Sequence, residues 1–240
     1  MLVPGGTHCI AGMIYDALAM ARLSGPDKRD QLVIFHGLYM QEKLSCELIS
    51  WAEAERLCQR LANLIRESGF RPDLVIAIGR GGYVPARLVC DWLDIMELTS
   101  IKIEHYLSGA NRQEKAVIRY PLKADIKDLR VLVVDDVNDM GDTLEVATQH
   151  LQIFQPGEIR TAVMHQKAVT RFKADYSAGK IIKWRWLIYP WAVNEDVSDF
   201  LERLTPAPGS LEDAQIRLAQ RFNIRISLKR LGDVYAAMDR

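Results

Sequence analysis

The sequence predicts an α/β fold in which a buried parallel sheet is flanked by helices. Two segments, Leu74–Leu93 and Val131–Phe154, each place a short apolar strand before a polar loop and a helix. A further apolar strand is expected at Arg160–His165. Short, continuous apolar runs are typical of strands that are buried on both faces, as in parallel sheets. With 240 residues and 49% hydrophobic content, the chain can form one large domain with small appendages.

Residues 1–46 carry the weakest pattern. Apolar residues recur at helical spacing between Ile10 and Ala21, which predicts an amphipathic helix, and Gln31–Tyr39 predicts a strand. We therefore expect an N-terminal extension over residues 1–46, for which the pattern indicates no role.

A glycine-rich loop lies between the first strand and its helix. The helix before this strand begins after Ser50, which forms a capping box with Glu53. The strand follows at Leu74–Ile78, and the next helix is expected over Pro85–Leu93. Three glycines around an arginine allow close approach of the backbone and add a positive charge, which suits a pyrophosphate. The same pattern is found in tight structural turns. The residues of the loop are Gly79, Arg80, Gly81 and Gly82.

A β-hairpin is predicted by two segments with alternating polarity, Ser100–Tyr106 and Val117–Tyr120. The segment between them, Leu107–Ala116, is polar. It is either an ordinary surface loop or a lid that closes over a site and excludes water from it.

An acidic segment follows the apolar run Val131–Val134. Asp135 and Asp136 come directly after that strand, and Gly141 stands before a helix whose apolar residues begin at Leu144. The first N–H groups of a helix have no intrahelical partner and the helix dipole is positive there, so this turn suits an anion such as phosphate. Carboxylates at the end of the strand can accept hydrogen bonds from sugar hydroxyls or help to hold a hydrated Mg²⁺. The segment therefore predicts a site for a phosphorylated sugar.

The acidic segment resembles the motif with which type I phosphoribosyltransferases bind 5-phosphoribosyl 1-pyrophosphate (PRPP): a hydrophobic strand, two acids, a spacer, then Asp-Thr-Gly-x-Thr. The resemblance implies a type I phosphoribosyltransferase-like parallel sheet flanked by helices, with a small hood and a helical C-terminal appendage. Met140 departs from the motif, because the family usually has a threonine there that helps to bind the 5′-phosphate. Besides the glycine-rich loop, the resemblance implies PRPP binding by Asp135, Asp136, Met140, Gly141, Asp142 and Thr143.

A lysine and an aromatic segment make the chain similar to the purine branch of this family. Lys167 comes just beyond the strand at 160–165 and resembles a lysine that donates to the purine 6-oxo group. Trp186 resembles the aromatic residue that stacks on the base, next to Leu187 in the base site. Trp184 and Trp191, which complete three tryptophans in eight residues, are expected to pack at the edge of the core.

The resemblance implies an enzyme, a pentosyltransferase of purine salvage. It would convert Mg²⁺-bound PRPP and a 6-oxopurine (hypoxanthine, guanine or xanthine) to the nucleoside 5′-monophosphate and pyrophosphate. Asp139 is expected to act as general base near purine N7. Asp135 and Asp136 are expected to hold the ribose hydroxyls, and to hold the metal directly or through PRPP or water.

The alternative is a non-catalytic PRPP or nucleotide sensor that regulates transcription with the same fold. Met140 and a pair of C-terminal helices favour it. The presence of Asp139, Lys167 and Trp186 favours the enzyme, because a PRPP sensor has no need to deprotonate and stack a purine.

The C-terminal helices are predicted at Leu211–Phe222 and Leu228–Met238, after a linker at Thr205–Ser210. Helix, turn, helix can be a DNA-reading unit. Residues 205–240 contain six Lys or Arg and four Asp or Glu, so their net charge is only +2. We therefore expect a packing or dimer-contact appendage over 205–240, after a phosphoribosyltransferase domain over 47–204.

Composition excludes several other classes. The 31 Lys and Arg residues balance the 31 Asp and Glu residues, so the chain as a whole does not attract nucleic acid or anionic membranes. No apolar run reaches membrane-spanning length, and Asp16 interrupts the apolar stretch at the N-terminus, so a cytoplasmic location is expected. A homo-oligomer is also expected. The histidines show no metal-binding spacing, and neither a disulfide scaffold nor a zinc site is indicated by the four scattered cysteines, Cys9, Cys46, Cys58 and Cys90.

Overall fold

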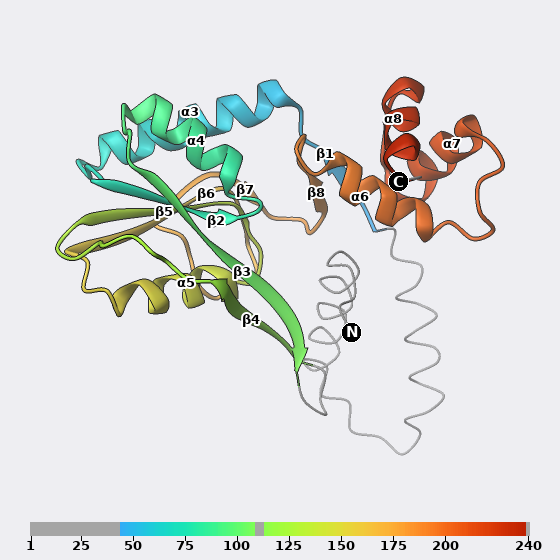
Figure 1. Cartoon of the computed structure of the whole chain (residues 1–240). Coiled ribbons are helices and arrows are strands. Elements are labelled where there is room, and N and C mark those ends of the chain that lie inside the picture. The colour runs from blue at the N-terminus through green and yellow to red at the C-terminus, as the bar shows by residue number, and fades with distance from the viewer. Residues whose placement is uncertain (1–43, 109–112, 239–240) are drawn as a thin grey trace, which may run out of the picture. The chain divides into compact units, whose positions relative to one another are not determined.

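The computed structural model describes residues 44–108 and 113–238 (Figure 1). Two compact units are present. The first, Ile49–Trp184, is called the sheet unit here, and the second, called the C-terminal unit, contains the described residues 44–48 and 185–238. The helix predicted between Ile10 and Ala21 and the strand predicted at Gln31–Tyr39 lie outside the described residues.

The sheet unit is built on six strands in the order β4-β3-β2-β5-β6-β7. All neighbouring pairs are parallel except β3 and β4, which form an antiparallel hairpin. The predicted α/β fold with a mostly parallel sheet is therefore confirmed. The strands are β2 (Leu74–Gly79), β3 (Leu98–Ser108), β4 (Gln113–Tyr120), β5 (Arg130–Asn138), β6 (Glu158–Lys167) and β7 (Tyr176–Ile181).

Helices cover both faces of this sheet. Helices α3 (Trp51–Glu67) and α4 (Tyr83–Leu93) lie on one face, and α5 (Asp142–Gln152) lies on the other (Figure 1). The predicted cap of α3 is present, since the Ser50 side chain accepts a hydrogen bond from the backbone N–H of Glu53 at 3.1 Å. Such a cap satisfies a donor that the helix itself leaves without a partner.

The core explains why the central strands read as continuous apolar runs. All six residues of β2 are buried, so alternate side chains pack under α5 and under the pair α3 and α4. Burying one large aliphatic side chain contributes roughly 1.5–3 kcal/mol. The core on the side of α5 includes Ile76, Ile101, Val131, Val133, Leu144 and Leu151.

Several strands extend further than the sequence pattern predicted, among them β3, β4 and β5. β5 continues through Asp135 to Asn138, so the two acids lie in the strand and not in the loop that follows it. The β3–β4 pairing reaches Ser108 and Gln113, which leaves only residues 109–112 of the predicted polar loop between the strands, and these lie outside the described residues. Ladder hydrogen bonds come from the backbone, so polar side chains do not end a paired strand.

The C-terminal unit combines a two-stranded parallel sheet with three helices. Their apolar sides meet in one core that contains Phe200, Leu218 and Leu231, each at most 1% exposed. The two predicted C-terminal helices are confirmed with the predicted bounds, and their burial against the first helix is what a packing role requires. The elements are β1 (Cys46–Leu48), β8 (Trp186–Ile188), α6 (Val193–Glu202), α7 (Leu211–Phe222) and α8 (Leu228–Met238).

None of the helices in residues 44–108 and 113–238 is both long enough and apolar enough to cross a membrane.

Candidate functional site

The carboxyl ends of β2, β5 and β6 lie along one edge of the sheet, because these strands are parallel neighbours. In open α/β sheets this edge is where ligands bind. The glycine-rich loop follows β2, and the acidic segment ends β5. Lys167, predicted to lie just beyond the strand at 160–165, is the last residue of β6. The sheet unit therefore gathers at one edge all the residues predicted to bind PRPP, together with Asp139 and Lys167.

The glycine-rich loop lies against the end of β5. A Cβ atom on Gly81 would lie 2.5 Å from both carboxylate oxygens of Asp136, and a Cβ atom on Gly82 would lie 2.3 Å from the carbonyl oxygen of Val134. Gly82 is also the N-cap residue of α4, and its N–H donates to the carbonyl of Ile78 at 2.8 Å. Glycine is thus required for the backbone of this loop to reach the acids.

The two adjacent acids of β5 have different surroundings. Asp135 is 8% exposed and its Oδ1 accepts a hydrogen bond from the backbone N–H of Asp136 at 2.9 Å. Burial, and after it the charge of Asp136, raises the pKa of Asp135 well above its usual range, against the smaller opposing effect of that hydrogen bond. Asp136 is more open, so the pair offers one buried and one accessible carboxyl group at the strand end.

These acids suit a hydrated Mg²⁺ better than a metal held by the protein alone. Within the described ranges, no group of three or more His, Cys, Asp or Glu residues could enclose an ion. Mg²⁺ is commonly bound by one or two carboxylates and completes its shell with water and substrate phosphates. Asp135 and Asp136 fit that donor set.

The turn between β5 and α5 is held by the segment at 170–172. Gly141 has a φ of +105°, and a Cβ atom on it would lie 2.6 Å from the backbone N of Phe172. The Asn138 side chain donates to the carbonyl of Phe172 at 2.7 Å, and the Arg171 N–H donates to the carbonyl of Met140 at 2.9 Å. The turn is therefore fixed before any ligand arrives.

The first turn of α5 follows directly. Asp142 and Thr143 occupy its first two positions, where backbone N–H groups lack intrahelical partners. The Thr143 Oγ1 lies 3.0 Å from the Nε2 of His105 on β3. Met140, Gly141, Asp142 and Thr143 thus form the turn for which anion binding was predicted, and the Met140 thioether supplies no hydrogen-bond donor there.

Lys167 and Asp139 form an ion pair in which the lysine is buried and the Asp139 side chain is 23% exposed. The Lys167 side chain is 4% exposed, and its Nζ lies 2.6 Å from the Asp139 Oδ2. The other carboxylate oxygen, Asp139 Oδ1, is buried and has no hydrogen-bond partner among the described residues. A buried acceptor without a partner is costly, so it marks a place where a ligand donor would be stabilised.

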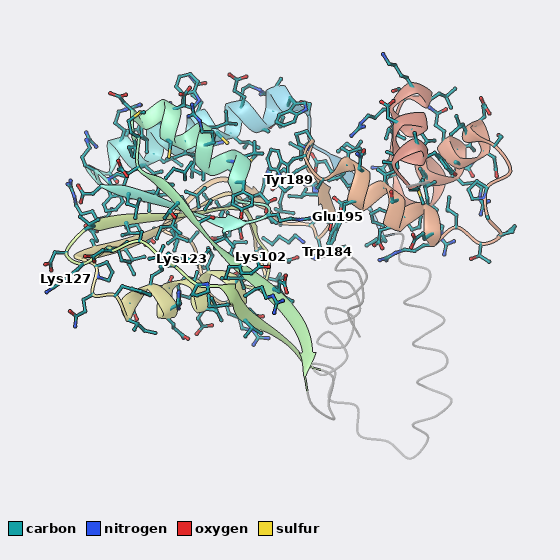
Figure 2. The ribbon with its side chains drawn as sticks, viewed as in Figure 1. Lys102, Lys123, Lys127, Trp184, Tyr189 and Glu195 are labelled. Carbon is teal, nitrogen blue, oxygen red and sulfur yellow. The ribbon has the colours of Figure 1, made fainter. Side chains whose placement is uncertain are left out.

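Trp184 contacts the lysine of this ion pair. It lies in the connection after β7 (Figure 2), and the Lys167 Nζ lies 4.6 Å from the centroid of its ring. The prediction that Trp184 packs at the edge of the core did not include this contact with Lys167. Trp191 stacks on Tyr189 with ring centroids 5.0 Å apart.

Trp186 and Leu187 belong to β8 of the C-terminal unit. The Trp186 backbone N–H donates to the Ser45 carbonyl at 2.9 Å, which aligns β8 with β1. The Trp186 indole nitrogen is buried without a hydrogen-bond partner in the described part of the chain, and Leu187 is 7% exposed.

Sequence reasoning missed the residues that fix the turn between β5 and α5. Asn138, Thr170 and Phe172 hold the turn before α5, but only Asn138 lies in the acidic segment, where its position could have been noticed. Trp184 carried one signal, its membership of a cluster of three tryptophans.

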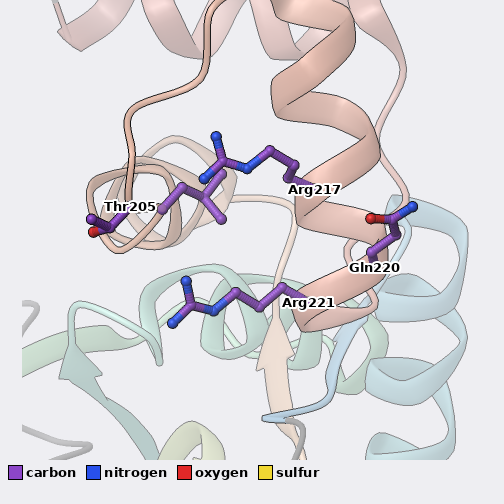
Figure 3. A pocket seen from close by; sticks show the side chains of 5 residues that line it. Thr205, Arg217, Gln220 and Arg221 are labelled. Atoms are coloured by element: carbon purple, nitrogen blue, oxygen red, sulfur yellow. The ribbon is translucent and has the colours of Figure 1, made fainter.

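A hollow of about 300 Å³ lies in the C-terminal unit (Figure 3). Arg217 and Arg221 project from α7 into it, and they donate to the carbonyls of Pro206 at 2.6 Å and Arg203 at 3.2 Å. The last carbonyl groups of a helix have no N–H partner within the helix, and cations are favoured near them. These arginines therefore stabilise the end of α6 and the turn after it. The hollow is lined by Leu204, Thr205, Arg217, Gln220 and Arg221.

Comparison with known proteins agrees with this geometry. Residues 47–196 match the family model described as the phosphoribosyl transferase domain. The xanthine-guanine phosphoribosyltransferase of Ruegeria sp. (strain TM1040) is 32% identical over 154 residues, which cover 60% of this chain and 83% of that protein. The hypoxanthine-guanine phosphoribosyltransferase of Saccharomyces cerevisiae is 28% identical over 190 residues, with 60% and 85% covered. A crystal structure of a purine phosphoribosyltransferase from Pyrococcus horikoshii Ot3 shares 34% identity at a TM-score of 0.54, with 61% and 93% covered.

Proposed function

The chain belongs to the phosphoribosyltransferase family, and from this premise we propose that it is a purine phosphoribosyltransferase acting on 6-oxopurines in purine salvage. The reaction joins PRPP to hypoxanthine, guanine or xanthine and releases pyrophosphate. The relatives with purine substrates in their names support the base class, since the similarity covers most of their length.

One observation carries the proposal, the ion pair of the buried Lys167 with the partly exposed Asp139. A 6-oxopurine presents an acceptor, its 6-oxo oxygen, beside a donor, its N7–H. Lys167 Nζ donates one of its three N–H groups to Asp139 Oδ2, and it can donate another to the 6-oxo group. Asp139 Oδ1 is buried and lacks a partner among the described residues, so it can accept from N7–H. The pair therefore presents the complementary donor and acceptor.

The remaining edge residues are suited to PRPP. The loop of Gly79, Arg80, Gly81 and Gly82 would bind its pyrophosphate through backbone N–H groups and the Arg80 guanidinium. The Gly82 N–H donates to the Ile78 carbonyl, so Gly82 would contribute by allowing close approach of the backbone. The hydroxyls of the ribose would donate to Asp135 and Asp136, and the 5′-phosphate would lie on the anion-binding turn at 140–143. Mg²⁺, when bound with PRPP, would neutralise the pyrophosphate and improve it as a leaving group.

The chemistry then requires few groups. The bond from ribose C1′ to the pyrophosphate oxygen breaks with its electron pair on pyrophosphate, and purine N9 forms the new bond to C1′. The proton on N7 passes to Asp139 Oδ1 as the base loses its positive charge. Positive charge on the ribose and negative charge on pyrophosphate develop together, so donors fixed at the glycine-rich loop stabilise the transition state.

A nucleotide sensor that regulates transcription is the second candidate. Met140 favours it, because the anion-binding turn lacks one hydroxyl donor. The helices α7 and α8 were the other feature that favoured a sensor, but their apolar sides are buried in the core of the C-terminal unit. We prefer the enzyme because a sensor that binds PRPP alone would not use the Lys167–Asp139 pair, which is proposed to bind the base.

The test is turnover of Mg-PRPP with hypoxanthine, guanine, xanthine and adenine, followed by pyrophosphate release. We expect release with at least one 6-oxopurine and much less with adenine, whose 6-amino group is a donor facing another donor. Tight PRPP binding without release from any base would support the sensor and contradict the enzyme.

A further inference from the structure

We propose that Trp184 is a positioning residue that holds the Lys167 ammonium in place for the 6-oxo group of the base, and so contributes to base selectivity. The inference deepens the proposed function and rests on it. The contact itself can be tested separately, because it is a property of the protein alone.

Lys167 is enclosed by partners of two kinds. Asp139 Oδ2 accepts a hydrogen bond from its Nζ at 2.6 Å, and the Trp184 ring lies under the same nitrogen at 4.6 Å from Nζ to centroid. A cation over an indole face is attracted by the ring quadrupole, and tryptophan provides the strongest such attraction among the aromatic residues. With Lys167 only 3% exposed, little solvent competes for the ammonium.

Packing alone does not account for an indole at this position. The Trp184 Nε1 is buried and has no hydrogen-bond partner among the described residues, and a buried donor without a partner is unfavourable. A phenylalanine or leucine would fill the space without that cost. The residue also lies in an irregular connection between β7 and β8, so no strand register requires an aromatic there.

The consequence for the base follows from geometry. A lysine side chain has a flexible stem, and its ammonium is hydrated wherever water reaches it. Asp139 on one side and the Trp184 ring on another restrict Nζ, so its remaining donors keep a fixed direction. A donor with a fixed direction favours binding of a base with an oxygen acceptor at purine C6 and disfavours a base with a 6-amino donor.

The kinetic test compares Trp184→Leu with Trp184→Phe. Loss of the ring in Trp184→Leu should raise the KM for hypoxanthine by about tenfold, while the KM for PRPP stays within about twofold. Trp184→Phe keeps an aromatic face and should stay within about threefold of the unmodified protein for both substrates. Trp92→Leu, which removes a 39% exposed indole from α4, is the matched control and should change neither KM.

A combined variant shows whether Trp184 acts through Lys167. In a Lys167→Met background, Trp184→Leu should leave the KM for hypoxanthine nearly unchanged, because the group that it positions is already absent. A full further loss in that background, or an equal rise of both KM values in Trp184→Leu, would indicate a structural role and overturn the proposal.

A second readout does not depend on turnover. Acetylation of Lys167 by an amine-reactive ester, followed by peptide mass spectrometry, should be slow in the unmodified protein and in Trp184→Phe, and severalfold faster in Trp184→Leu. If no base is turned over but this pattern holds, the proposed function fails while the Lys167 contact stands. Equal labelling rates in the Leu and Phe variants would overturn the positioning role whatever the activity.

Discussion

The two ends of strands β2 and β5 carry acidic residues in opposite electrostatic situations. At the amino end, Asp73 accepts from the backbone N–H, Nε and Nη2 of Arg130 at 2.8, 3.0 and 2.6 Å. These hydrogen bonds lower the pKa of Asp73 to about 2. At the carboxyl end, burial and the adjacent Asp136 raise the pKa of Asp135 well above its usual range.

The contrast separates an end at which the protein stabilises its own acid from the end that is proposed to bind PRPP, called the binding end below. The protein itself provides the partner of Asp73, so that acid favours folding at neutral pH. Asp135 disfavours it, because its charged form is better solvated in the unfolded chain. Carboxylates that cost stability at one edge are expected where a ligand or cation supplies the missing interaction.

The largest effect at the binding end is expected for Asp139→Asn. An amide cannot take the N7 proton, so turnover should fall by about 10²-fold or more, the usual scale for losing a general base. PRPP affinity, measured by calorimetry, should change little, because Asp139 is assigned to the base. Unchanged turnover would remove Asp139 from the mechanism.

Next in size is Trp186→Ala in the C-terminal unit. Stacking of a base on an aromatic side chain contributes about 1–3 kcal/mol, which corresponds to a rise in the purine KM of about 5- to 150-fold. The KM for PRPP should not change. Equal rises in both values, together with a lower melting temperature, would point to a folding defect instead.

Met140→Thr sharpens the account of the anion-binding turn. A hydrogen bond from a hydroxyl to a charged group contributes about 1.5–3 kcal/mol, so PRPP should bind roughly tenfold more tightly, the factor that about 1.4 kcal/mol represents. Calorimetric titration of Mg-PRPP into both proteins measures this. Level or weaker binding would mean that Met140 packs in the turn and does not simply lack a contact.

Asp135→Asn should raise the free energy of unfolding at alkaline pH, because it removes a buried acid whose charged form is unfavourable in the folded protein. Because the pKa is raised in the folded state, the folded protein binds more protons than the unfolded chain, and its stability falls as pH rises above about 4, the unfolded value. The variant should therefore match the unmodified protein near pH 4 and exceed it in free energy of unfolding at pH 8. Urea unfolding at both pH values checks this, and a variant less stable at pH 8 would contradict the assigned penalty.

The smallest effect is expected at the opposite end, for Asp73→Asn. The pKa is lowered there, so the contribution is present above about pH 4 and is lost as pH falls toward about 2. The pair is partly exposed to solvent, which limits the loss in free energy of unfolding at pH 7 to about 0.2–1 kcal/mol. Turnover should not change. A loss of activity would contradict the claim that the amino end of these strands contributes to stability alone.

The sequence indicated the binding end better than the contacts that hold it. Apolar runs such as Val131–Val134 specify buried parallel strands, and parallel strands bring their carboxyl ends together, so the grouping of the acidic segment with Lys167 was predictable. The end of β5 was not, because backbone pairing carries the strand past the apolar run to Asn138. The role of Trp184 was also hidden, since spacing along the chain does not reveal which ring lies under a buried ammonium.

Phosphorus NMR of Mg-PRPP mixed with hypoxanthine and the full chain tests the central claim most directly. The proposed function predicts that the PRPP signals disappear while pyrophosphate and a nucleoside 5′-monophosphate grow in equal amounts, and only when base is present. In Asp139→Asn the same signals should grow about 10²-fold more slowly. PRPP that persists with hypoxanthine, guanine and xanthine alike, or pyrophosphate that forms without any base, would contradict the assignment of this sheet edge to purine phosphoribosyl transfer.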